Sequence, residues 1–116
     1  MTLINESSAL DALGGDKNLL VELAKMFAED APKVLGNLQI AMDAGDRGVV
    51  HSEVHLLKGL VSTFFAKPVV ELAQRLENAA AVGDLDLFLT GGFDELQVKV
   101  KAMVHNFKIR GWVASE

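Results

Sequence analysis

The stretch HSEVHLLKG places two histidines, a lysine and a glycine at spacings that could support chemistry. On a helix with about 100° per residue, His51, Lys58 and Gly59 fall within roughly 60° of His55. The small residue Ser62 falls on the same face. Such a face could form a metal site, a phosphoryl-accepting site, or an ordinary solvated surface.

The opposite face of the same helix is apolar. Val50, Leu57 and Val61 recur there at helical spacing, so we expect this face in the core and His55 in solvent. Glycine in the middle of a helix lowers helix stability by about 1 kcal/mol relative to alanine, so the presence of glycine at position 59 needs an explanation. Close approach by a partner protein is one such explanation.

Leu56 and Leu60 flank the polar face, and their role is open. They could form the apolar rim of a docking surface, or they could belong to the edge of the core. The residues that we assign to a possible docking face are His51, Ser52, Leu56, Leu60 and Ser62.

A zinc site is not expected here. In the zinc motif HExxH the glutamate directly follows the first histidine, whereas Glu53 stands two places after His51 and about 160° around the helix from His55. Lys58 would repel a cation, and His105 lies on another predicted helix. We therefore predict no metal ligands. Glu53 itself faces the core side, where it would reach solvent or meet an arginine (Arg47 or Arg75).

A phosphoryl group suits the same residues better. A neutral imidazole is nucleophilic near pH 7 because the unperturbed pKa of histidine is about 6.5, and a phosphorylated side chain gains roughly two negative charges. Lys58, one turn away, could offset that charge. Gly59 would let the active site of another protein close over His55, as in-line phosphoryl transfer requires.

Composition narrows the remaining choices. The chain has 116 residues, half of them hydrophobic, so one domain is expected over residues 1–116. The absence of cysteine excludes disulfides and thiolate chemistry, and the net charge of −5 argues against nucleic-acid binding. No apolar run approaches the roughly 20 residues of a membrane span, and the start of the chain lacks the features of a signal peptide. We expect a soluble, cytoplasmic protein.

Helix formers dominate the chain, and glycine-aspartate pairs divide it. Each pair offers a glycine to end one helix and an aspartate to begin the next. The predicted helices lie near residues 5–13, 16–43, 46–66, 68–82 and 84–108.

Proline and glycine modify these helices. Pro32 should kink or divide the long second helix. The Lys67-Pro68 pair should separate the third helix from the fourth. Gly91-Gly92 should weaken the last helix near its start. Four long amphipathic helices joined by short turns predict an all-α, antiparallel up-and-down four-helix bundle with a short extra N-terminal helix.

In this setting HLLKG resembles the signature of the histidine-containing phosphotransfer (HPt) domain of multistep phosphorelays. The likeness extends to ALDALGGDKNLLVELAKMFAEDAPKVLGNLQIAMDAGD before it and LAQRLENAAAVGD after it. The chain departs from the family pattern at Leu60, where members usually have a small residue, and at Phe65, where they usually have a second glycine. These two positions affect the packing at the helix end and the partner footprint.

The resemblance implies roles for individual residues. His55 would be the phosphorylated residue, Lys58 its charge partner and Gly59 the residue that gives clearance to the partner. Glu77 would face His55 from the next helix and orient its ring. The partners would be response-regulator receiver domains or a hybrid sensor kinase. We expect no cofactor on the chain, with Mg²⁺ held by the receiver, and a monomer.

Other functions remain to be weighed. An autophosphorylating kinase is not expected, because Leu56 stands where such kinases usually carry an acidic residue, and no glycine-rich nucleotide site is present. The chain could still be a domain of a hybrid sensor kinase. The alternative is a helical adaptor that binds a response regulator without transferring phosphate. A hydrolase is disfavoured because the scattered hydroxyls of Ser52, Ser62 and Thr63 form no catalytic set.

Overall fold

The computed structural model describes residues 3–114, so the two residues at each end of the predicted domain 1–116 lie outside the described part. The elements are, in order, α1 (Glu6–Ala12), α2 (Lys17–Ala44), α3 (Arg47–Ser62), α4 (Lys67–Ala81), the short π-helical segment η1 (Phe88–Gly92) and α5 (Phe93–Ile109). The prediction of an all-helical chain is confirmed for the described residues. None of their helices is both long enough and apolar enough to cross a membrane.

Two of the three glycine-aspartate pairs act as predicted. The side chain of Asp16 accepts a hydrogen bond from the backbone N–H of Leu19 at 3.0 Å, and that of Asp46 accepts from Val49 at 3.2 Å. Gly45 ends α2 in the left-handed conformation, with φ of 67°. These caps satisfy backbone groups that a helix end leaves without partners, so α2 and α3 meet in a tight turn.

The third pair does not begin a helix. The side chain of Asp84 accepts from the N–H of Asp86, two residues on, and so shapes a turn. The expected helix at 84–108 is interrupted, because Gly91 has φ of 122° within η1, and α5 begins only at residue 93. Gly92 lies so close to α4 that an added Cβ would be 2.8 Å from Leu76 Cδ2. The predicted weakness at the glycine pair is therefore a break between two helical segments.

The third helix is shorter than predicted. It ends at Ser62 instead of residue 66, and Phe65 takes a left-handed conformation with φ of 51°. Phe64 turns into the core, where it is buried, and the chain then enters α4 at Lys67. A left-handed conformation is least costly for glycine, so Phe65 occupies this position at some strain.

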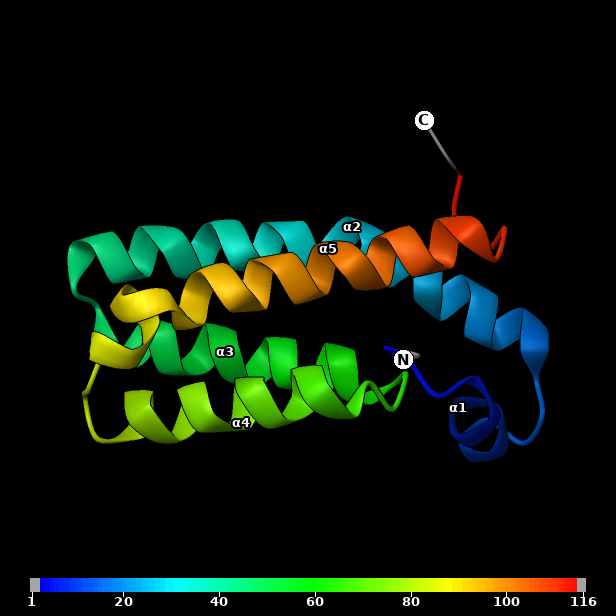
Figure 1. The fold of residues 1–116 in the computed structure, drawn as a ribbon, viewed down its shortest axis with the longest axis horizontal. Coiled ribbons are helices and arrows are strands. Elements are labelled where there is room, and N and C mark those ends of the chain that lie inside the picture. The colour runs from blue at the N-terminus through cyan, green and yellow to red at the C-terminus, as the bar shows by residue number, and fades with distance from the viewer. Residues whose placement is uncertain (1–2, 115–116) are drawn as a thin grey trace.

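Pro32 does not divide the second helix. α2 runs through it from Lys17 to Ala44. Its first turns are inclined to the remainder in Figure 1, and they lead back to α1. A proline removes one backbone donor and crowds the preceding turn, which a long helix can accommodate by bending.

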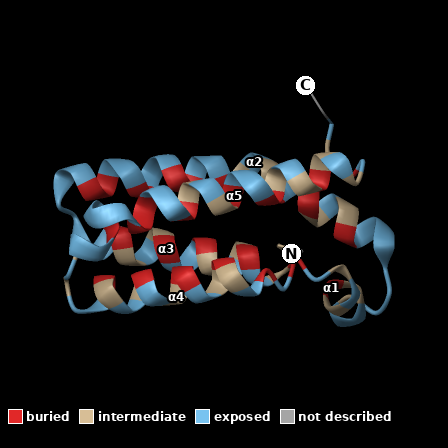
Figure 2. Cartoon of the chain, in the orientation of Figure 1, coloured by how far each residue is buried: buried red, intermediate tan, exposed pale blue. Residues whose placement is uncertain are grey.

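The long helices α2, α3, α4 and α5 lie side by side and run in alternate directions (Figure 1). The buried residues of each helix face the other helices, as the red stripes in Figure 2 show. At the end near α1, Phe27, Phe64 and Phe107 pack edge to face or tilted, with ring centroids 4.7–5.7 Å apart. This aromatic packing joins α2, α5 and the turn between α3 and α4.

Candidate functional site

His55 projects from the middle of α3 into solvent. Its side chain is 64% exposed, whereas Val50, Val54, Leu57 and Val61 on the opposite face are fully buried. The prediction that the core claims the apolar face and leaves His55 outside is confirmed. The amphipathic pattern of α3 is the physical cause.

Glu77, on α4, contacts the His55 ring. His55 Nδ1 lies 3.1 Å from one carboxylate oxygen of Glu77 and 3.2 Å from the other. A carboxylate accepts hydrogen bonds and does not donate them when ionised, so this contact favours the tautomer with the proton on Nδ1. Nε2 then keeps a free lone pair on a ring that is mostly open to solvent.

Lys58 shares the same carboxylate. Its Nζ lies 2.9 Å from Glu77 Oε1 and donates a hydrogen bond to Gln74 Oε1 at 3.1 Å. Gln74 in turn donates to Asn78 Oδ1 at 2.9 Å. The ammonium group is thus held against α4, one helical turn from His55.

Gln74 and Asn78 were not singled out from the sequence. The spacing of these residues is the sequence signal that could have identified them. Glu77 and Asn78 follow Gln74 by three and four residues, so all of them share one face of α4. Which helix that face would meet could not be read from the spacing.

The charge on Glu77 is secured by these contacts. Burial by itself raises the pKa of this carboxyl, but the hydrogen bonds from Lys58 and His55, together with the positive charge of Lys58, outweigh it and leave the pKa below its usual value. Glu77 therefore stays ionised near neutral pH, as an acceptor for Nδ1 requires.

The small residues of the face leave it open. Gly59 is exposed, and an added Cβ would meet nothing within 4 Å. Packing within the described residues gives no reason for glycine there. The hydroxyls of Ser62 and Ser52 donate to the carbonyls of Lys58 and Gly48 on their own helix, so neither reaches toward His55.

The flanking leucines differ from each other. Leu56 is 50% exposed, whereas Leu60 is half-buried and packs against the core. The exposed leucine suits a docking surface, and the half-buried one belongs in part to the core.

Glu53 pairs with neither Arg47 nor Arg75, and its Oε2 is buried without a hydrogen-bond partner among the described residues.

The other histidines occupy different settings. The His51 ring is stacked with the His55 ring, with centroids 6.5 Å apart and 12° between the planes. His105 lies on α5 in a hollow beside Pro32 and Leu35. Within residues 3–114, no three or more metal-ligating side chains lie close enough together to hold an ion.

Comparisons with known proteins place this geometry in a family. The family model of the Hpt domain matches residues 22–107, well over half of the chain and all of the site. The crystal structure of histidine-containing phosphotransfer protein B (HptB) from Pseudomonas aeruginosa PAO1 is similar, with a TM-score of 0.84 and 19% identity over 93% of each chain. No curated protein matches the chain in sequence.

At 19% identity the likeness to HptB establishes the fold alone, and the sequence match to the family model carries the assignment. The chain belongs to the Hpt domain family, whose members carry phosphoryl groups on histidine in phosphorelays and are not themselves enzymes.

Proposed function

We propose that His55 accepts a phosphoryl group from the phosphoaspartate of one receiver domain and passes it to the aspartate of another. The observation that carries this proposal is the contact of His55 Nδ1 with Glu77 on a side chain that is 64% exposed. This contact directs the reactive nitrogen, Nε2, toward solvent. The proposed carrier is a monomeric, antiparallel up-and-down four-helix bundle that uses no ATP of its own.

The transfer balances without a further reactant. The Nε2 lone pair attacks phosphorus, the P–N bond forms, the P–O bond to the aspartate breaks, and the aspartate leaves as a carboxylate. The ring then carries phosphorus on Nε2 and a proton on Nδ1, so it is cationic, and the Glu77 carboxylate stabilises it. The reverse sequence returns the group to a second aspartate.

Lys58 and Gly59 have separate tasks in this proposal. The Lys58 ammonium, one turn from His55, offsets negative charge on the phosphoryl oxygens. Gly59 leaves space for the receiver backbone to approach. Mg²⁺ would be held by the receiver, as in other phosphoryl transfers between a metal-bearing site and a simple acceptor.

The test is phosphotransfer from receiver domains charged with acetyl phosphate in the presence of magnesium. Acid-labile label on His55 is expected in the wild type, identified by mass spectrometry at neutral pH, and its complete loss is expected in His55→Gln. His105→Gln, which removes a histidine on α5, should label normally. If receivers bind the chain but none of them labels it, the transfer proposal is rejected and the adaptor function takes its place.

A further inference from the structure

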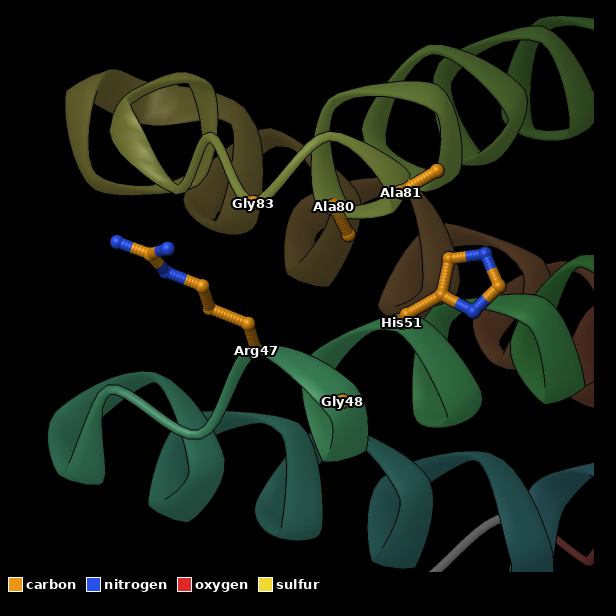
Figure 3. A pocket seen from close by; sticks show the side chains of 6 residues that line it. All are labelled: Arg47, Gly48, His51, Ala80, Ala81 and Gly83. Carbon is orange, nitrogen blue, oxygen red and sulfur yellow. The ribbon is translucent and has the colours of Figure 1, made fainter.

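A groove lies next to the site, between the start of α3 and the end of α4 (Figure 3). Its volume is about 390 Å³, and it is lined by Arg47, Gly48, His51, Ala80, Ala81 and Gly83. Arg47 and His51 flank it from α3, and the opposite wall consists of residues with little or no side chain. The groove is therefore open in the middle, with the guanidinium of Arg47 at one edge and the imidazole of His51 at the other.

The positive charge of Arg47 is not paired with a carboxylate within the described residues. Its guanidinium makes no ion pair or side-chain hydrogen bond there, in contrast to Lys58, which Glu77 holds. Asp84 and Asp86 line a second hollow beyond Arg47, but neither carboxylate comes within ion-pair distance. Gly83 lies so near that an added Cβ would be 3.1 Å from Arg47 Nη1, so glycine leaves room for the guanidinium.

Arg47 lies within reach of any protein that covers His55. Arg47, His51 and His55 are four residues apart on α3, and eight residues correspond to about 12 Å along a helix. A standard interface buries about 800 Å² on each partner, which corresponds to a disc of roughly 16 Å radius. A disc centred on His55 would therefore include Arg47 near its rim.

We propose that this groove receives an acidic side chain of the receiver domain that docks on His55, with Arg47 as its principal partner and His51 at the other edge. The inference rests on the proposed function and adds a contact that selects the partner. The guanidinium of Arg47, which has no ion pair among the described residues of a chain of net charge −5, favours an acidic group at this groove. A charge at an interface rim acts mainly on association rate and on the choice between partners.

The experiment measures association and dissociation rates between the full chain and a panel of receiver domains, for wild type, Arg47→Glu and Arg75→Glu. Arg75 is an exposed arginine on α4 beside Glu71 and Glu95, and it also lacks an ion pair among the described residues. The two variants thus make the same charge change at different places. Glutamate is acceptable at the start of α3, where the helix dipole favours negative charge.

For the receivers that bind, Arg47→Glu is expected to slow association about tenfold at low salt, while dissociation changes little and Arg75→Glu stays near wild type. The difference should shrink toward 1 M salt, where the screening length falls to about 3 Å. Equal slowing by both variants, no slowing by either, or a panel in which no receiver binds would overturn the inference.

The two proposals can fail separately. Normal labelling of His55 with no effect of Arg47→Glu would reject the groove contact and leave transfer intact. Binding that depends on Arg47 without any labelling would reject transfer and leave the groove contact intact.

Discussion

Two glutamates, Glu6 and Glu77, each join two basic side chains, and only one of these junctions includes a group that can react. Glu6 lies 2.7 Å from Lys17 Nζ and also pairs with Arg110, which is 104 residues away in sequence. Lys17 and Arg110 both lie over the ring of Trp112. This junction connects α1, the start of α2 and the end of α5, and all of its charged groups have partners.

The junction at Glu77 has the same chemistry but a different outcome. One of its two partners is the ammonium group of Lys58, and the other is the imidazole of His55, which has a second nitrogen on an exposed side chain. Lysine and arginine satisfied by a carboxylate hold a fold together. A histidine held at one nitrogen is presented for reaction at the other, so the second ring nitrogen of His55 distinguishes the two junctions.

The largest difference should come from Glu77→Ala. Loss of a charge-assisted hydrogen bond, worth about 1.5–3 kcal/mol, is expected to slow labelling of His55 by about tenfold or more. Glu77→Gln keeps an acceptor oxygen and should recover part of the rate. Nitrogen chemical shifts of the His55 ring report its tautomer. If Glu77→Ala keeps both the wild-type tautomer and the wild-type labelling rate, Glu77 does not orient the His55 ring.

Glu6→Gln should act on stability alone. Two partly exposed ion pairs contribute about 0.2–1 kcal/mol each, so the free energy of unfolding should fall by about 1 kcal/mol, with labelling unchanged. Glu95→Gln is the control, because that carboxylate has a single partner, Lys99, at 3.9 Å.

The pH dependence of the same variant sharpens the test. The hydrogen bond from Lys17 is the main cause that lowers the pKa of Glu6 from its usual value of 4.5, against the opposing effect of burial. Its stabilisation is therefore complete above pH 4.5 and is lost as the pH falls through the lowered pKa. Denaturant unfolding should show the gap between wild type and Glu6→Gln closing only in acid, and a gap that persists unchanged there would rule out ionisation of Glu6 as its source.

The smallest effect is expected for Gly59→Ala. Alanine is favoured over glycine in a helix, so the variant should be more stable by about 0.5–1 kcal/mol. Gly36→Ala in α2 is a matched control, since an added Cβ there also meets nothing within 4 Å. Both variants should gain stability, but only Gly59→Ala should label more slowly. Equal labelling rates in the two variants would remove the clearance role of Gly59.

Local rules predicted much of this molecule. The aspartate caps at residues 16 and 46 follow from hydrogen bonds within one turn, and the outward position of His55 follows from the period of a single helix. The same rules failed at Asp84, where a turn uses the carboxylate, and at the end of α3, where Phe65 takes a left-handed conformation with φ of 51°.

The sequence by itself determined that the chain is helical and that His55, Lys58 and Gly59 share a polar face, because helical period is a property of neighbouring residues. The resemblance predicted that Glu77 faces His55. Only the tertiary structure decided that the same carboxylate also contacts Lys58, that Gln74 accepts a hydrogen bond from Lys58, and that a groove opens beside Arg47. These features depend on how α3 and α4 are rotated and spaced against each other. That arrangement is set by the packing of the whole core, to which residues far apart in the sequence contribute together.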